Sequence, residues 1–202
     1  MPQTQRRQPK QARSRELVDR ILTSAGELFA GRGFPNVTTN HIAEHAGVSI
    51  GSLYQFFADK DEILAALQDK WTERLRAELD LRLRPEPGVT LAETVEQVLE
   101  VHATLNRQPP GLLGFLLIST AHTDHSNALI AAIHERVVEI LTVHAPLLSR
   151  QRLDVIASML VHITNGLYTV GLTAGATDPA VRAEVRAALL GYLSLIAGSA
   201  QR

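Results

Sequence analysis

The sequence predicts an all-α protein of about nine helices. Apolar residues recur with helical spacing along nearly the whole chain, and no stretch alternates well enough to indicate a strand. Groups of glycine and proline interrupt this pattern at intervals that suit helix ends and loops. With 202 residues, of which 45% are hydrophobic, the chain can bury one large core together with a small satellite domain.

The first helix is expected over residues 14–32. Its apolar side chains fall on one face, and Gly31 and Gly33 interrupt the helix at its end. The residues before it, 1–12, are rich in arginine and glutamine and are expected to form a basic flexible arm.

Two short helices are expected next, over residues 39–46 and 50–57. Thr38 and Ser49 are favourable N-cap residues for them, and Gly47 marks the end of the first. Two short helices joined by a tight turn have the size and punctuation of a DNA-reading helix-turn-helix, although the same pattern also suits a plain surface hairpin.

A long helix follows, opened by Asp59 and Glu62 in the spacing of a capping box and ended by residues 85–88. The domain boundary is expected inside it, which gives a DNA-binding domain over 13–65 and a larger domain over 66–202. The larger domain is expected to contain further helices near 90–107, 112–118, 128–145, 150–174 and 179–197.

The net charge of −1 is unevenly distributed. Residues 1–60 carry eight Lys/Arg against five Asp/Glu, or +3, and the remainder carries twelve against sixteen, or −4. The positive end is therefore where DNA would dock. With no cysteine and no apolar stretch after the first basic residues, a cytoplasmic protein is expected. The uncharged run 155–177 approaches the length of a membrane span, but His, Thr and Asn residues interrupt it, so no membrane partner is expected.

Helical geometry sorts the second short helix into two faces. Leu53 and Phe57 point inward, and Ile50, Gly51, Tyr54 and Gln55 share the outer face. Gln55 can read adenine and Ile50 can contact a thymine methyl, while Gly51 permits close approach of the backbone to DNA. The residues expected to bind phosphates or base edges are Ser49, Ser52, Tyr54, Thr39 and Lys60, the last two at helix starts that favour a phosphate.

The residues from Thr38 to Leu64 read T-T-x-x-I-A-x-x-A-G-V-S-x-G-S-L-Y-x-x-F-x-x-K-x-x-I-L. This pattern resembles the signature of the TetR family of transcriptional regulators, and the resemblance covers about residues 13–65. The position before Phe57 often carries a phosphate-binding His or Tyr in that family. Here it is Phe56, so that contact is not expected.

For residues 66–202 the resemblance implies an effector pocket among the middle helices and a homodimer formed by the last two helices. The sequence is compatible with the dimer because these two helices carry small residues between larger apolar ones, although the same pattern suits an intrachain core. The small residues are Ala157, Gly166, Gly171, Ala174, Ala187, Ala188 and Gly191.

A pocket for a small apolar or amphipathic effector is expected to have apolar walls and a few orienting polar groups. The candidates are Trp71, Leu105, Phe115, Leu116 and Tyr168 for the walls, and His102, His122, His162 and Asn165 for the polar groups. Each histidine also suits a hydrogen-bonded core position. His122 and His125 have a spacing that two metal ligands can use, but they fall in an expected loop, so neither a metal nor a cofactor is expected.

The expected function is therefore that of a homodimeric repressor, which binds a pseudo-palindromic operator and is released when an effector shifts the long helix. No nucleophile with a base, paired carboxylates or phosphate-binding loop suggests an enzyme. The alternative is an all-helical carrier or enzyme for an apolar molecule, which has no need of the basic amino-terminal end. The sign of regulation is not encoded in the chain, because it depends on where the operator lies.

Overall fold

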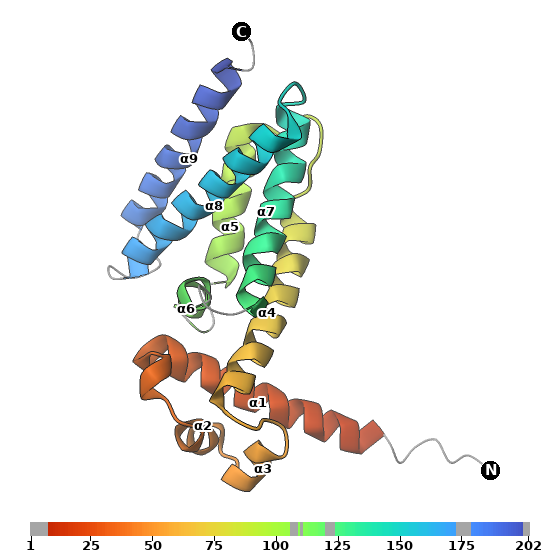
Figure 1. The fold of residues 1–202 in the computed structure, drawn as a ribbon, viewed down its shortest axis with the longest axis vertical. Coiled ribbons are helices and arrows are strands. Elements are labelled where there is room, and N and C mark those ends of the chain that lie inside the picture. The colour runs from red at the N-terminus through yellow and green to blue at the C-terminus, as the bar shows by residue number, and fades with distance from the viewer. Residues whose placement is uncertain (1–7, 106–108, 110, 120–123, 173–178, 200–202) are drawn as a thin grey trace, which may run out of the picture. The chain divides into compact units, whose positions relative to one another are not determined.

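The computed structural model describes residues 8–105, 109, 111–119, 124–172 and 179–199. Over these residues all regular structure is helical, with nine α-helices, one short 3-10 helix and no strand, which confirms the predicted fold class. Figure 1 shows the helices, whose bounds are α1 (Gln8–Arg32), η1 (Phe34–Asn36), α2 (Thr39–Ala46), α3 (Ile50–Tyr54), α4 (Lys60–Arg82), α5 (Leu91–Leu105), α6 (Leu112–Ser119), α7 (Asp124–His144), α8 (Arg150–Leu172) and α9 (Pro179–Ser199).

The chain forms two compact units, Met1–Asp69 and Lys70–Arg202. The helix α4 contains residues of both units. The two units meet between residues 69 and 70, whereas the sequence places the domain boundary between residues 65 and 66. In the first unit, α2 packs against α1 and α3. Its core consists of apolar side chains from every helix, among them Ile21, Phe29, Ile42, Leu53 and Ile63, none of which is exposed.

Three helix bounds differ clearly from the sequence-based expectation. The helix α7 begins at Asp124 instead of residue 128, so His125 lies in a helix and not in the expected loop. The helix α1 begins at Gln8 instead of residue 14, so residues 8–12 of the expected arm are helical. Glutamine, lysine, alanine and arginine are good helix formers, and Pro9 is tolerated in a first turn, so nothing in this stretch stops the helix. The helix α3 ends at Tyr54 because the amides of Phe56 and Phe57 both donate to Leu53 O, which closes the helix in a tight turn.

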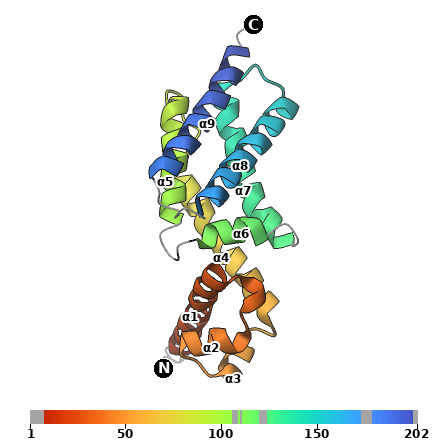
Figure 2. The ribbon, with the colours of Figure 1, turned by 90° about the vertical axis from the view of Figure 1, so that its left-hand side faces the viewer.

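In the second unit, α7 packs against α8, and α9 packs against both α5 and α8. Figure 2 shows α6 lying across one end of these helices, where it contacts α7 and α8. Leucine, isoleucine, valine and alanine side chains from α5, α7, α8 and α9 form one core, which includes Leu99, Val138, Ile156, Leu160, Val185 and Leu189.

An ion-pair group on the surface joins α5 to α9. Glu96 accepts from Arg186 Nε at 2.5 Å and from Arg182 Nη2 at 3.1 Å, and Arg182 also reaches Glu100 at 3.2 Å. The hydrogen bond from Arg186 lowers the pKa of Glu96 below its usual value. Because these side chains are substantially exposed, the pairs fix the register of the two helices more than they stabilise the fold.

Candidate nucleic-acid interface and effector cavity

The turn between α2 and α3 has a fixed geometry. Thr38 caps α2 by accepting from the amide of His41, and Gly47 ends α2 with φ +63°, a left-handed conformation that favours glycine. Arg20 of α1 donates to Ala46 O at 2.9 Å and to Gly47 O at 3.1 Å. The guanidinium thus satisfies carbonyl groups that the end of a helix leaves without partners. This role of Arg20 was missed at the sequence level, where it counted only as positive charge.

The helix α3 has an inner and an outer face, as the sequence predicts. Leu53 and Phe57 are buried in the core, whereas Ile50 is 37% exposed and Tyr54 is 53% exposed. Gln55 follows as the C-cap residue in helical conformation, so it continues the outer face and is also exposed. An isoleucine and a tyrosine held in water on a short helix are available to a partner surface.

Thr39 and Tyr54 are brought together across the two helices. Thr39 Oγ1 and Tyr54 OH form a hydrogen bond of 3.0 Å, although fifteen positions separate them in the sequence. Both hydroxyls belong to exposed or half-buried residues, so each can also bond to a phosphate oxygen. The pair places two donors at one point of the outer surface.

Three other predicted DNA contacts have partners inside the unit. Ser49 Oγ accepts from the amide of Ser52 at 3.0 Å and bonds to Ser52 Oγ at 2.7 Å, so Ser49 caps α3. Lys60 Nζ donates to Phe34 O at 2.7 Å and lies 4.1 Å from the centre of the Phe34 ring. Lys60 therefore ties the start of α4 to η1, a role that its position in the sequence does not reveal.

Gly51 has no neighbour that requires a glycine. A Cβ atom added there would meet only Ser49 Oγ, at 4.0 Å. The absent side chain therefore leaves open space on the outer face, as expected for a position where a partner approaches the backbone.

The basic residues at the amino-terminal end are described only in part. Arg13 and Arg15 are exposed on α1, whereas Arg6 and Arg7 lie outside the described residues.

The second unit contains an apolar cavity of about 110 Å³. Leucine, valine and isoleucine side chains make up most of its wall, contributed by α4, α5, α6, α7, α8 and α9. The polar residues in the wall are Thr94, His102, Arg136, Thr164 and Asn165. Thr94 Oγ1 and Thr164 Oγ1 donate to carbonyl groups four residues earlier in the chain, at Thr90 and Leu160.

The predicted pocket residues are only partly gathered here. His102, Leu105 and Asn165 line the cavity. Trp71, Phe115 and Leu116 are buried or half-buried but do not line it, and His162 is exposed, with Nδ1 2.7 Å from Ser158 O. His122 and the side chain of Tyr168 lie outside the described residues.

His102 is a neutral group in this wall. Its side chain is buried, and burial lowers the pKa of the imidazole to about 3. Removal from water disfavours the charged form of a histidine. His102 therefore contributes a polar but uncharged surface to the cavity at neutral pH.

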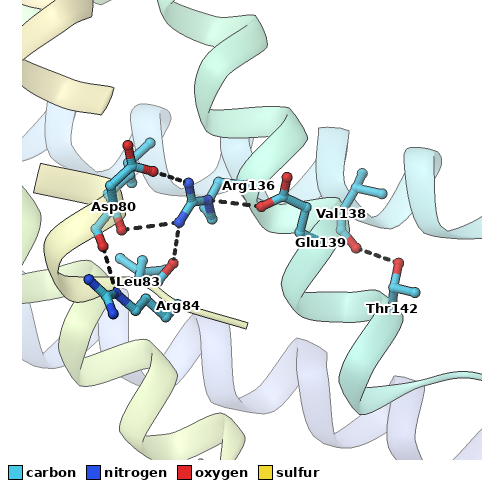
Figure 3. A network of polar contacts seen from close by, with 8 residues as sticks. Asp80, Leu83, Arg84, Arg136, Val138, Glu139 and Thr142 are labelled. Carbon is cyan, nitrogen blue, oxygen red and sulfur yellow. Dashed lines mark hydrogen bonds and ion pairs between the residues drawn. The ribbon is translucent and has the colours of Figure 1, made fainter. Parts of the chain in front are cut away.

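Arg136 of α7 was missed by sequence reasoning. It lines the cavity and at the same time contacts the end of α4, as Figure 3 shows. The sequence carries one signal for it, because Arg136 lies between Ile133, Val137 and Ile140 on an otherwise apolar face of its helix. A charge at such a position needs a specific partner.

The helices α8 and α9 expose a face of small and apolar residues. Val155 and Met159 of α8 are 50% and 47% exposed, and Leu195 of α9 is 73% exposed. The small residues exposed beside them are Gly166, Ala187, Ala188 and Gly191. Ala157, in contrast, is buried in the chain's own core, and Ala174 and the surroundings of Gly171 lie outside the described residues.

The described part of the chain contains neither a metal-binding cluster nor a membrane-spanning helix. No group of three or more His, Cys, Asp or Glu residues there is placed to hold a metal ion. None of the described helices is both long enough and apolar enough to cross a membrane.

Comparison with known proteins relates both units to one group of regulators. The sequence model of bacterial regulatory proteins of the tetR family matches residues 21–67, and that of the tetracyclin repressor-like C-terminal domain matches residues 90–193. The HTH-type transcriptional regulator PksA of Bacillus subtilis is 26% identical over 133 residues, which cover 64% of this chain and 62% of PksA. The alignment thus spans less than two thirds of that relative's length.

Solved structures share the fold at lower identity. A TetR-family regulator from Streptomyces coelicolor superposes with a TM-score of 0.67 at 23% identity, covering 91% of this chain and 98% of that one. A complex of SmeT, the repressor of a Stenotrophomonas maltophilia multidrug efflux pump, with triclosan has a TM-score of 0.68 at 18% identity, covering 89% and 91%. The helix-turn-helix, the all-helical second unit and the two matching sequence models together place this chain in the TetR family of DNA-binding transcriptional regulators.

Proposed function

We propose that this regulator is a homodimeric repressor, which binds a pseudo-palindromic operator and leaves it when a small apolar or amphipathic effector binds. The observation that carries the proposal is the outer face of α3, where Ile50, Tyr54 and Gln55 are exposed beside Thr39. Exposure to solvent does not stabilise an isoleucine and a tyrosine on a five-residue helix, whereas contact with a DNA groove does.

The exposed residues divide into those that read sequence and those that hold the backbone. Gln55 suits adenine and Ile50 suits a thymine methyl, and Gly51 lets the helix approach the bases. Thr39 and Tyr54 bind phosphate, which fixes the orientation of the helix but carries no sequence information. Ser49, Ser52 and Lys60 support this arrangement through their contacts within the unit and add phosphate contacts at its edge.

A second copy of the chain is the proposed occupant of the exposed face of α8 and α9. Val155, Met159 and Leu195 give this face apolar contacts, and Gly166 and Gly191 allow two helix pairs to approach closely. A two-fold axis through the face would create a self-complementary interface. The two recognition helices would then meet half-sites about one turn of DNA apart, roughly 34 Å.

The effector is proposed to occupy the cavity in the second unit. Its walls are almost entirely apolar, which suits a molecule with a hydrocarbon or aromatic body. The fold is able to hold such a molecule, since SmeT has been solved with triclosan. The helix α4 begins at Lys60 and contributes Leu75 and Leu79 to the cavity, so a shift of this one rigid element couples the effector to DNA binding.

The test is a titration of the DNA upstream of the chain's own gene with the full chain. Fluorescence anisotropy measures binding at several salt concentrations. Specific binding that weakens as salt rises, and that Tyr54→Ala reduces far more than Thr142→Ala at an exposed position of α7, supports the proposal. The proposal would be wrong if wild type and Tyr54→Ala bound this DNA and unrelated DNA with equal affinity. A carrier or enzyme for an apolar molecule would bind its ligand in the cavity and show no such DNA affinity.

A further inference from the structure

The cavity wall contains one formally charged residue among the lining residues that the structure describes, and this residue is Arg136. The imidazole of His102 is neutral, and the remaining polar residues are threonines and an asparagine. A cation beside an apolar cavity is poorly screened by water, so it interacts more strongly with an anion there than it would on the surface. Arg136 is therefore the residue of this wall that attracts a negatively charged partner.

The guanidinium of Arg136 is engaged with the end of α4, as Figure 3 shows. Nη1 donates to Leu83 O at 2.7 Å and to Leu79 O at 3.2 Å, and Nη2 forms a short contact with the Asp80 carboxylate. Nε lies 3.0 Å from Glu139 of its own helix. Arg136 thus attaches the last turn of α4 to α7 through two backbone carbonyl groups and a carboxylate.

The last turn of a helix is a site where such an attachment matters. Its final carbonyl groups lack partners within the helix, and the helix dipole places partial negative charge there, which a cation stabilises. Arg84 supplies a second donor, from Nε to Asp80 O at 2.9 Å. Arg136 differs from Arg84 because it comes from another helix and lines the cavity, so a molecule bound in the cavity contacts the same residue that holds α4.

Of the two carboxylate partners of Arg136, Asp80 is open to replacement. The Asp80 side chain is 69% exposed, whereas the Arg136 side chain is only 18% exposed. An ion pair with one half in water contributes little to stability. A carboxylate that arrives from the cavity can pair with the guanidinium in place of Asp80 while Asp80 returns to water.

We propose that Arg136 selects an effector with an apolar body and a carboxylate end, and that this carboxylate takes Arg136 from Asp80 and from the carbonyl groups that end α4. Arg136 is then both the specificity-determining residue of the cavity and the positioning residue of α4. The inference rests on the proposed function for its consequence at DNA, but the choice of ligand charge is independent of DNA.

The experiment compares three ligands with the same eight-carbon chain, octanoate, octan-1-ol and octylamine. Each is titrated by calorimetry into the full chain, and into the variants Arg136→Gln, Arg136→Lys and Asp80→Asn. Arg82→Gln is the matched control, because Arg82 pairs with Glu78 at the same end of α4 and does not line the cavity. Hydrogen exchange of the amides of residues 79–83 reports the end of α4 directly, and circular dichroism checks that each variant is folded.

Wild type is expected to bind octanoate at least about tenfold more tightly than octan-1-ol, the factor that a hydrogen bond to a charged group supplies. Arg136→Gln loses this preference, Arg136→Lys retains part of it, and Asp80→Asn binds octanoate more tightly because one of the two competing carboxylates is gone. Octanoate also speeds exchange at residues 79–83 in wild type and in Arg82→Gln.

Equal binding of octanoate and octan-1-ol by wild type, or binding of none of the three ligands, overturns the proposed selectivity, whatever the variants do. Tight binding of octanoate with unchanged exchange at the end of α4 overturns the positioning role of Arg136. If the three ligands release operator DNA equally, the proposed function stands and this inference fails. If the chain binds no operator, the proposed function fails, and calorimetry and exchange still decide the role of Arg136.

Discussion

Thr39 Oγ1 and Tyr54 OH are 3.0 Å apart, so a hydrogen bond joins the first residue of α2 to the last residue of α3. The bond connects the two helices of the helix-turn-helix on their outer side, while Leu53 and Ile42 connect them on the inner side. It also holds two hydroxyl groups in a geometry that a phosphate oxygen can share. The relative position of the two helices and the phosphate contact therefore depend on the same pair.

We expect the two hydroxyls to act as one unit in DNA binding. Tyr54→Phe and Thr39→Val should each weaken operator binding by about fivefold to tenfold, the effect of one hydrogen bond. The double variant should be little weaker than either single variant, because each change already removes the shared arrangement. Anisotropy titrations with operator DNA measure the three values, with Thr142→Val as the control. Additive losses would mean that the two hydroxyls act separately.

Gln55 is expected to determine sequence preference. Gln55→Ala should relax discrimination at one base pair of each half-site by about 1–3 kcal/mol, because a bidentate contact to adenine is lost. Affinity for unrelated DNA should stay nearly unchanged, since phosphate contacts dominate there. Competition with operators that carry single base-pair changes measures this, with Gln151→Ala on α8 as the matched control. A uniform loss over all sequences would instead assign Gln55 to the backbone.

Lys60 is expected to stabilise the first unit as well as to serve DNA binding. Lys60→Met removes the hydrogen bond to Phe34 O and the contact with the Phe34 ring, which should cost the unit about 1 kcal/mol. Native-state hydrogen exchange of the amides of α1–α3 measures this unit by itself, which a single melting temperature of a two-unit chain does not. Arg32→Met removes the same charge from an exposed position and should leave exchange unaltered. If hydrogen exchange is unchanged in Lys60→Met, Lys60 does not stabilise the unit and serves DNA binding alone.

The face formed by Val155, Met159 and Leu195 is expected to hold the dimer together. In a self-complementary interface, Met159→Glu places two like charges close to each other and to apolar side chains. Sedimentation should therefore show a monomer instead of a dimer at micromolar concentration. Leu147→Glu is the control, because Leu147 is 83% exposed but lies outside the face, between α7 and α8. A dimer that survives both Met159→Glu and Leu195→Glu would place the interface elsewhere.

The neutral state of His102 predicts a dependence of stability on pH. Burial lowers its pKa in the folded chain to about 3, from an ordinary value of 6.5, so the unfolded chain binds more protons between these values. The free energy of unfolding should therefore fall as pH decreases below about 6.5, by about 1.4 kcal/mol per pH unit from this group. His102→Leu should show a shallower slope between pH 7 and pH 4.5 in urea titrations. Identical slopes would indicate that His102 gains its proton without unfolding.

Patterns within one element were sufficient to predict the helices and the outer face of the helix-turn-helix. Caps at Thr38 and Ser49, the glycine at position 47 and the spacing of Leu53 and Phe57 are properties of neighbouring residues. The end of α3 was not predicted correctly, because a tight turn at Phe56 and Phe57 replaces its last helical residues without any proline or glycine to mark it.

The cavity could be predicted only in kind. Six helices meet there, and the residues that line it follow from how these helices pack, which apolar spacing does not specify. Leu105 and Leu116 look alike in the sequence, yet one lines the cavity and the other does not. Trp71, the most conspicuous residue of α4, packs elsewhere, with Arg74 4.9 Å from its ring centre.

The sequence by itself determined that the chain is helical, which residues form the outer face of the helix-turn-helix and which family it resembles, because each of these depends on residues within a few turns of one another. The tertiary structure decided which polar groups have partners. The sequence does not distinguish the roles of three cationic residues, Arg20, Lys60 and Arg136. In the structure each donates to a backbone carbonyl on a distant segment. A long side chain binds where packing brings it to a carbonyl that can accept a further hydrogen bond, and only the folded chain brings the two together.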